Sequence, residues 1–435
     1  MDLASCTPTC ENRRMSSPRR TILGRVVDPL RDFLRTEASG GILLVAASIA
    51  ALVWANSRWR SAYTRLWSHH LLVRLPFGLH GLDLSLQHWV NDGLMTIFFL
   101  VVGLEIKREM TSGHLAGRRA ATLPALAALG GMAVPALVYL AIAGRTAAHG
   151  WGVPMATDIA LAVGVLVLAG PAVPPALRAF LLGLAVVDDI GAIVVIAVFY
   201  STGVSFGWLA AAGAAIAATA LVKALGGHHV VVFVVLGVVA WYGLHEAGVH
   251  PTIAGVAMGL LAPVTPRHRL REPGGEAGAD PADETVVEWL EHVLHPWSSF
   301  AIVPIFALAN AGIHVTGASL RAAWGSAITW GIIAGLLLGK PIGVLLATRA
   351  TVRARLADAP GGTTRRQLLG AGNAAGIGFT VALFIAELAF RDGKGVVNAE
   401  EVADAKMAIL AASLVSGVVA FLVLRQRRAE PTKLS

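Results

Sequence analysis

Charged residues are scarce in this sequence. Of its 435 residues only 14% are charged, whereas 55% are hydrophobic. A soluble globular domain carries about 25% charged residues. Too little polar surface is therefore available to cover a soluble particle of this size, which excludes an ordinary soluble protein.

The 2 cysteines provide neither a disulfide framework nor a metal site. Cys6 and Cys10 both lie in the polar N-terminal tail without a partner elsewhere, so we interpret them as unpaired surface thiols. A phosphate-binding motif of the form GxxxxGKS or GxxxxGKT is also missing. This absence favours a proton gradient over nucleotide hydrolysis as the energy source, and we expect no cofactor.

No basic patch with interleaved aromatic residues accompanies the net charge of +8. A basic chain can bind nucleic acid. Here, however, the basic residues fall between apolar stretches, as the positive-inside rule describes for membrane proteins. We therefore expect a lipid bilayer as the partner, and no nucleic acid.

Long apolar stretches, by contrast, recur along the whole chain. Each is close to the roughly 20 residues that cross about 30 Å of hydrocarbon as a helix. Because backbone groups in lipid must satisfy one another, the sequence predicts an all-α polytopic membrane protein. We expect about twelve transmembrane helices by this length rule, near residues 39–56, 87–104, 121–143, 154–170, 177–200, 206–223, 229–244, 249–264, 290–312, 326–348, 368–390 and 405–424.

The chain is expected to form one membrane domain between two tails. Residues 1–38 are rich in Arg and poor in acidic residues, without a signal-peptidase pattern, and predict a disordered cytoplasmic tail. The membrane domain covers residues 39–424, and residues 425–435 form a cytoplasmic C-terminal tail. Most Lys and Arg residues fall on the cytoplasmic side when both termini are placed there.

Two connections have distinctive composition. Residues 71–86 alternate apolar and polar side chains around two glycines, which predicts a small extracytoplasmic β-hairpin. The exposed edge of such a hairpin is a candidate for pairing between two copies of the chain. Residues 265–287 are rich in Arg, Pro, Gly, Asp and Glu, and predict a flexible cytoplasmic loop.

Asp188 and Asp189 are the strongest functional signal, because they lie deep within an apolar span. A charge at the centre of a membrane costs about 2.5–3.5 kcal/mol or more, and such residues mark ion pathways. Adjacent helical residues point about 100° apart, so both carboxylates can border one cavity in different environments. Repulsion between the two carboxylates and their burial both disfavour ionisation of at least one of them. That carboxylate can then bind a proton near neutral pH and exchange it for a hard cation such as sodium. The alternative is a pair at a helix end that faces water.

Further polar residues interrupt other spans. Asp158 follows Pro154 and Thr157 at the start of a short span, which predicts an interrupted helix, although an ordinary N-cap Asp would look the same. Lys340 lies near the middle of its span and needs an acidic partner, unless it snorkels to an interface. The segment 370–388 contains four glycines and Asn373 early in a span, which allow either close helix packing or an unwound stretch; paired with the break around residues 154–158, it predicts a second interrupted span. Two interrupted spans in corresponding halves point to a transporter binding site.

Nine short motifs follow one another in a characteristic order. They are ASGGILL (38–44), WVNDGLMTIFFLVVGLEIKRE (89–109), ATDIA (156–160), VVDDIGAI (186–193), GVHPTIAGV (248–256), LEHVLHPW (290–297), FALANAGI (306–313), GLLLGKPIG (335–343) and GIGFT (376–380). With these motifs the chain resembles the NhaA-type sodium/proton antiporter family from about Glu37 to Arg428. The resemblance implies a transporter of the bacterial inner membrane rather than an enzyme.

The resemblance also implies a fold and a set of site residues. Inverted repeats and two broken helices that cross near the midplane are expected. Sodium would bind at Asp188 and Asp189, with Asp189 as the principal ligand and Asp188 as the proton-linked partner. Asp158 and Lys340 would compensate the dipoles of the opposed half-helices, and Lys340 itself carries a proton in some accounts. Thr157 would line the cation path, while Asp92, in the second span, would have a structural role.

The family is regulated by pH, and seven residues match positions associated with that response: Glu105, Arg108, Glu109, Glu291, His292, His295 and His250. Histidine titrates in the right range, although a solvated cluster would look the same in sequence. The chain departs from the resemblance at Glu387, where a small or neutral residue is expected, and at Asn373. We expect Glu387 near the outer end of its span; the alternative is that it faces the cavity and adds a titratable group there.

Together these observations predict a pH-regulated, electrogenic transporter that exports sodium or lithium in exchange for protons by alternating access, as a homodimer through residues 71–86. A sodium-coupled solute symporter of similar fold is the alternative. A passive channel would lack coupling between the two gradients. A membrane hydrolase is disfavoured, because an aspartic protease dyad needs carboxylates that face each other from separate segments.

Overall fold

The computed structural model describes residues 37–74, 81–113, 115–170, 173–201, 203–226, 229–264, 285–391 and 398–425. Most of the two predicted tails and of the predicted 265–287 loop lies outside these residues, as do Cys6, Cys10 and the tip of the predicted hairpin. The prediction of one domain between two cytoplasmic tails stays a prediction.

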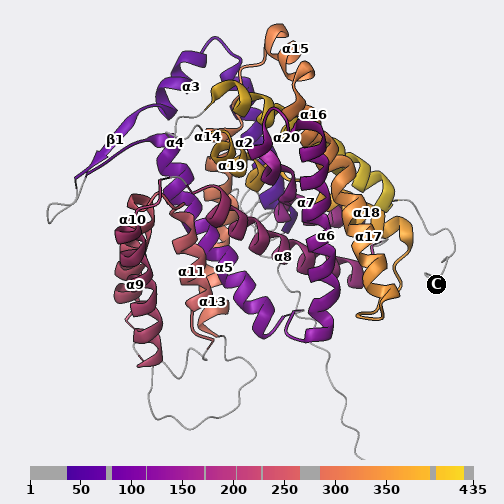
Figure 1. Cartoon of the computed structure of the whole chain (residues 1–435), viewed down its shortest axis with the longest axis horizontal. Helices are drawn as coiled ribbons and strands as arrows, with labels where there is room; N and C mark the ends of the chain where they lie inside the picture. The colour runs from indigo at the N-terminus through magenta and orange to yellow at the C-terminus, as the bar shows by residue number, and fades with distance from the viewer. Residues whose placement is uncertain are drawn as a thin grey trace, which may run out of the picture.

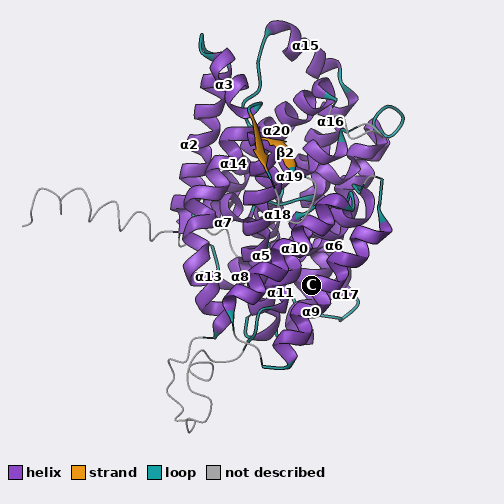
Figure 2. Ribbon diagram, turned by 90° about the vertical axis from the view of Figure 1, so that its left-hand side faces the viewer, coloured by secondary structure: helices purple, strands orange, loops and turns teal. Residues whose placement is uncertain are grey.

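Helices account for most of the described chain (Figure 2). The first half contains α2 (Glu37–Ala55), α3 (Arg60–Trp67), α4 (Leu86–His88), the π-helix η1 (Trp89–Leu94), α5 (Met95–Thr111), α6 (Arg118–Ala143), the 3-10 helix η2 (Ala148–Met155), α7 (Ile159–Leu168), α8 (Pro175–Phe199) and α9 (Phe206–Ala224). The second half contains α10 (Val230–Glu246), α11 (Thr252–Leu261), α13 (Val286–Trp297), the π-helix η4 (Ser298–Ile302), α14 (Val303–Asn310), α15 (Gly317–Gly325), α16 (Ala327–Ala334), the π-helix η5 (Gly335–Gly339), α17 (Lys340–Arg353), α18 (Arg365–Ala375), α19 (Phe379–Ala389) and α20 (Ala399–Arg425).

The apolar helices agree with the predicted multi-pass membrane protein. In the described residues, 8 helices are long and apolar enough to cross a membrane, or up to 10 when each bent pair counts as one span. Two shorter apolar helices, α10 and α11, complete the set. Each of the twelve predicted spans coincides with one of these segments. The short helices α3 and α15 were not predicted, because neither has an apolar run of spanning length.

The predicted hairpin is present as a two-stranded antiparallel sheet. Strand β1 (His70–Val73) pairs with β2 (Leu82–Ser85), with His70 opposite Ser85 and Val73 opposite Leu82. The hairpin extends sideways from the helices (Figure 1). Leu71 and Leu72 on β1 are exposed, so an apolar strand edge is available on this side of the molecule.

Two groups of three spans share the same order of elements. In each group a long helix is followed by a broken span and a second long helix: α6, η2 with α7, and α8 in the first, and α16 to α17, α18 with α19, and α20 in the second. Among the described helices, six spans lie between each member of the first group and its counterpart in the second, so their positions in the order of spans differ by seven, an odd number. Because successive spans cross the membrane in alternating directions, the two groups run in opposite directions, as the predicted inverted repeat requires.

Close packing of α6 against α17 fixes the position of Lys340. A Cβ atom at Gly339 would lie 2.7 Å from the Cα atom of Pro135, and one at Gly343 would lie 2.2 Å from the carbonyl oxygen of Gly130. Small residues let membrane helices approach backbone to backbone. Lys340, which lies between these two glycines, is therefore held within the bundle.

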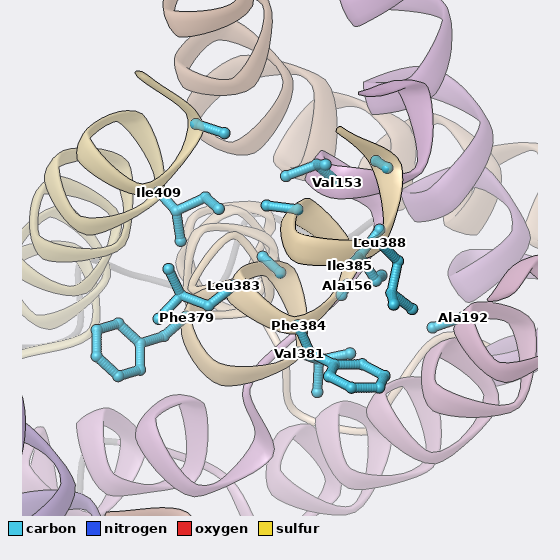
Figure 3. Packing of buried hydrophobic residues seen from close by; sticks show 14 of the residues in the cluster. Val153, Ala156, Ala192, Phe379, Val381, Leu383, Phe384, Ile385, Leu388 and Ile409 are labelled. Carbon is cyan, nitrogen blue, oxygen red and sulfur yellow. The ribbon is translucent and has the colours of Figure 1, made fainter. Parts of the chain in front are cut away.

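Helix α19 lies at the centre of the core. All of its residues are buried, although a helix at the surface of a bundle would expose one face. Figure 3 shows Leu383 on the side of Ile409 in α20, whereas Leu388 lies on the side of Ala192 in α8. Helix α19 therefore packs against members of the first three-span group as well as against α20 of its own group.

Candidate functional site

The two interrupted spans contact each other at their breaks. Residues 156–158 separate η2 from α7, and residues 376–378 separate α18 from α19. The amide of Asp158 donates a hydrogen bond to the carbonyl oxygen of Ile377 at 2.6 Å. Four half-helix ends therefore meet here, and their terminal backbone groups need partners outside their own helices.

Asp158 bridges the starts of two half-helices. Its Oδ1 atom accepts a hydrogen bond from the amide of Leu161 in α7 at 3.1 Å. Its Oδ2 atom accepts from the amide of Thr380 in α19 at 3.1 Å and from the hydroxyl of Thr380 at 2.7 Å. A carboxylate is stabilised at a helix N-terminus because the macrodipole is positive there. Asp158 is thus an N-cap and also a buried member of the crossing.

Lys340 and Thr157 lie at the ends of the other two half-helices. The ammonium group of Lys340 donates a hydrogen bond to the carbonyl oxygen of Met155, the last residue of η2. The Thr157 hydroxyl lies 2.8 Å from the carbonyl oxygen of Ala375, the last residue of α18. A cation at a helix C-terminus complements the negative end of the dipole. The charges at the crossing therefore match the polarity of the helix ends they contact.

The two adjacent aspartates of α8 have different surroundings. Asp188 is fully enclosed, and its Oδ2 atom lies 2.6 Å from the Lys340 ammonium and 2.6 Å from the Thr157 hydroxyl. The Oδ1 atom of Asp188 has no hydrogen-bond partner among the described residues. The carboxylate of Asp189 is also buried, but it pairs with no cation in the described part of the chain. The acidic partner that Lys340 needs is thus Asp188.

Asp189 faces a cavity of about 110 Å³. The polar residues that line this cavity come from five elements and from the break at residues 156–158, and include Glu105, Thr157, Asp158, Asp189, His295, Ser298, Ser299 and Thr380. Asp188 and Lys340 are not part of the lining. The cavity therefore offers carboxylate and hydroxyl oxygens around one unpaired carboxylate, while the ion pair lies directly behind it.

Six of the seven residues assigned to pH sensing lie on α5 and α13. Arg108 forms an ion pair with Glu291 at 2.5 Å and a longer one with Glu109 at 3.5 Å. Glu105 and His295 line the same cavity as Asp189, whereas His292 is exposed on α13. The network thus joins two helices beside the cavity mouth.

The seventh residue, His250, is separate from this network. Its Nε2 atom lies 3.5 Å from Asp92, and its Nδ1 atom lies 2.8 Å from the Thr252 hydroxyl. Asp92 also lies 3.7 Å from His245 and accepts a hydrogen bond at its backbone oxygen from Trp241. The predicted set of seven is therefore divided between two locations.

One buried ion pair was not predicted. Glu387, which was expected near the outer end of its span, does lie in the last turn of α19, but it is only 6% exposed. It pairs with Lys406 of α20 at 2.5 Å. The predicted span began at residue 405, next to Lys406, because several of the residues just before it are charged. In the structure α20 begins earlier, at Ala399, so Lys406 lies inside the helix. Asn373, the other departure, donates a hydrogen bond to the Leu369 carbonyl one turn earlier.

Comparisons with known proteins agree with this architecture. The chain matches the family described as Na+/H+ antiporter 1 over residues 31–424. It is 44% identical to the Na(+)/H(+) antiporter NhaA 2 of Sorangium cellulosum, over 94% of this chain and 92% of the relative. It is 45% identical to the Na(+)/H(+) antiporter NhaA 2 of Myxococcus xanthus, over 91% and 89%. It is 44% identical to the Na(+)/H(+) antiporter NhaA of Escherichia coli, over 92% and 98%.

Proposed function

The chain belongs to the Na+/H+ antiporter 1 family of membrane transporters, and we propose that it exports sodium or lithium across the bacterial inner membrane in exchange for protons. The observation that carries the proposal is the carboxylate of Asp189, which faces a cavity beside Asp158, Thr157 and Thr380 and has no cationic partner among the residues that the structure describes. Hard cations prefer oxygen ligands of this kind. The transported ion is thus a substrate, and no cofactor is needed.

Competition at Asp189 couples the two ions. A proton or a sodium ion can neutralise this buried carboxylate, but both cannot do so at once, and an ionised carboxylate in a dry site is costly. The site therefore changes its orientation only when it is occupied. Protons that enter from outside are released inward and are replaced by sodium, which leaves on the return.

The adjacent ion pair provides a second titratable unit. Asp188 and Lys340 are in contact at 2.6 Å within a fully enclosed region. A sodium ion beside Asp189 repels the Lys340 ammonium, which favours loss of a proton from the pair. More than one proton then moves for each sodium ion, and the exchange is electrogenic.

The network of Arg108, Glu109 and Glu291 connects pH to the site. It lies beside the cavity that Glu105, His295 and Asp189 share. Protonation of Glu105 or Glu291 changes the charge beside the cavity, and loss of the Glu291 charge weakens its ion pair with Arg108, which joins α5 to α13. We place this face on the cytoplasmic side, together with both termini, and we assign dimerisation to the hairpin at residues 71–86.

A layer of aromatic rings next to the Asp189 cavity supports alternating access. Thr380, at the start of α19, lines the cavity around Asp189. One turn further along α19, Phe384 is fully buried against Phe99 and Phe306, with ring centroids 5.7 and 6.3 Å apart. These three rings close the other side of the site. Movement of α19 past the rings would close one face and open the other.

Proton movement in proteoliposomes with an imposed pH gradient tests the proposal. Sodium or lithium, but not potassium, should dissipate the gradient with the wild-type protein and should have no effect with Asp189→Asn. Asp358→Asn is the matched control, because Asp358 lies exposed in the loop after α17. Exchange that survives Asp189→Asn would discard this site. Sodium uptake without proton counterflow in the wild type would instead support the symporter alternative.

Thermal unfolding in detergent provides a readout of binding that does not depend on transport. A ligand that binds only the folded protein stabilises it by about 2.7 kcal/mol at 100 times its dissociation constant. Sodium should therefore raise the melting temperature of the wild type and of Asp358→Asn, but not that of Asp189→Asn. Equal sodium stabilisation of all three proteins would place the cation elsewhere.

A further inference from the structure

A second buried pair of a lysine and a carboxylate lies in the membrane domain, away from the crossing. Glu387 and Lys406 are 6% and 8% exposed, and Oε1 of Glu387 lies 2.5 Å from the Lys406 ammonium. Desolvation offsets most of the attraction in such pairs, so a buried pair is weak evidence for stability. Ionisable residues inside membrane spans usually mark ion pathways.

This pair lines a cavity of its own. The cavity has a volume of about 390 Å³. Gln87 in its wall donates a hydrogen bond to Glu387 Oε1 at 3.4 Å and another to Asn310 Oδ1 at 3.1 Å. Asn91, also in the wall, exchanges hydrogen bonds with Asn310. Gln87 therefore presents its amide nitrogen to the carboxylate, and the amide oxygen of the same side chain is a neutral oxygen that this wall can offer to a hard cation.

Helix α19 connects this cavity with the one around Asp189. Thr380 lines the Asp189 cavity and Glu387 lines the larger one. The two residues are seven positions apart, which places them on one face of the helix about 10 Å from each other. Phe384 lies between them on the same face and packs against Phe99 and Phe306. The two cavities therefore lie at opposite ends of α19, separated by an aromatic layer.

We propose that Glu387 is a second cation-binding carboxylate, on the extracytoplasmic face, which receives sodium after its release from Asp189, and that Lys406 occupies it when sodium is absent. This inference rests on the proposed antiport function, because it concerns the outward path of the same ion. Sodium displaces the ammonium of Lys406 from the carboxylate, and Lys406 returns when sodium leaves. No covalent bond changes.

The other charges in the cavity explain why sodium would not remain bound. Arg391 lines the cavity and its Nε atom donates a hydrogen bond to the backbone oxygen of Glu387 at 2.9 Å. Lys406 adds a second cation, and His88 and His314 also face the cavity. The positive charges of Arg391 and Lys406 oppose a bound cation, so binding at Glu387 is weak and brief. An exit site needs this property, because a tight site would retain the ion.

Substitutions of Glu387 and Lys406 should have opposite effects on the affinity for sodium, and only at the extracytoplasmic face. Loss of the carboxylate in Glu387→Gln should raise the KM for extracytoplasmic sodium severalfold. Loss of the competing ammonium in Lys406→Gln should lower it. In both variants the KM for sodium at the cytoplasmic face should stay within about twofold of the wild-type value, because Asp189 is unchanged. Glu400→Gln is the matched control, since Glu400 is exposed in the first turn of α20 and does not line the cavity.

The measurement uses sodium-driven proton movement in right-side-out and everted membrane vesicles, which present opposite faces of the protein to added sodium. Opposite shifts of the extracytoplasmic KM in the two variants, with no shift in Glu400→Gln, would support the proposal. A purely structural pair would lower the melting temperature in both single variants, recover it in the double variant Glu387→Gln/Lys406→Gln, and leave the extracytoplasmic KM unchanged in all three. That result would overturn the proposal.

Two further outcomes also overturn it. Shifts in the same direction in both variants would contradict the competition between Lys406 and sodium. Equal shifts at both faces would contradict a separate outer site. Failure of the antiport function is recognised independently, because the wild type and Glu400→Gln would then show no sodium-dependent proton movement in either type of vesicle.

Discussion

The ammonium group of Lys340 lies 2.6 Å from Oδ2 of Asp188, whereas Asp189, the next residue in the chain, faces the cavity and pairs with no cation within the described segments. One helix thus presents two carboxylates in opposite situations. The charge of Asp188 is balanced by Lys340 inside the protein, whereas the carboxylate of Asp189 is available to a transported ion. The α-helix produces this division, because adjacent side chains point about 100° apart.

The Asp188–Lys340 pair should show strong energetic coupling. Loss of one partner leaves an unpaired charge in an enclosed region, which costs about 3–5 kcal/mol. Asp188→Asn and Lys340→Met should each lower the free energy of unfolding by that order. The double variant should lose clearly less than the sum of the two single losses. Denaturant unfolding in detergent measures all four proteins, and additive losses would show that the pair does not stabilise the fold.

Glu105 should influence the pH at which exchange begins. Its carboxyl group lines the cavity that Asp189 faces, so its negative charge favours a protonated Asp189 by Coulomb repulsion. Glu105→Gln removes that charge and should move the half-maximal activity to lower pH. Glu105→Asp, which keeps the charge, should retain the wild-type midpoint. Sodium-dependent proton movement in proteoliposomes over a pH series measures the midpoints, and equal midpoints in all three proteins would remove Glu105 from the response.

Gly255 should be required for the packing of α5 against α11. A Cβ atom at this position would lie 2.1 Å from the backbone oxygen of Thr96, which cannot move without the helix. Overpacking of this kind costs about 1–3 kcal/mol, so Gly255→Ala should lower the melting temperature.

Gly213 in α9 provides the matched control for this packing prediction. A Cβ atom there meets nothing within 4 Å, and alanine is favoured over glycine in a helix by about 0.5–1 kcal/mol. Gly213→Ala should therefore leave the melting temperature unchanged or raise it. A comparable loss of stability in both variants would mean that general helix effects, rather than the contact with Thr96, decide the outcome at Gly255.

The sequence was sufficient to predict the spans and to single out the charged residues within them, because both signals are local, whereas the crossing of the two broken spans was implied only by the family resemblance. Apolar length identifies a membrane helix, and a charge such as Asp189 or Lys340 stands out against an apolar background. The breaks at residues 156–158 and 376–378 were also predicted, from Pro, Gly and small polar residues within apolar segments.

The sequence did not predict which charges pair. The contact between Lys340 and Asp188 joins residues 152 positions apart in the chain, and nothing local distinguishes Asp188 from Asp158 or Asp189 as the partner. The Glu387–Lys406 pair was missed for a related reason. Each residue lies near the end of an apolar run and looks interfacial alone, and only the packing of α19 within the core buries both.

Phe384 should keep the two cavities separate. Its ring is fully buried against Phe99 and Phe306 between the positions of Thr380 and Glu387 on α19. Phe384→Ala would leave space in this layer, and we expect proteoliposomes with the variant to lose a pH gradient in the absence of sodium or lithium, which the wild type does not do.

Leu383→Ala separates this barrier function from a general loss of packing. Leu383 is also fully buried in α19 but lies on the side of Ile409, away from the aromatic layer (Figure 3). Both substitutions should destabilise the protein by several kcal/mol, about 2–5 for leucine and 3–5 for phenylalanine. Only Phe384→Ala should leak, because only Phe384 lies on the face that Thr380 and Glu387 share. An equal leak from both variants would mean that loosening of α19 in general, rather than loss of the aromatic layer, opens the path.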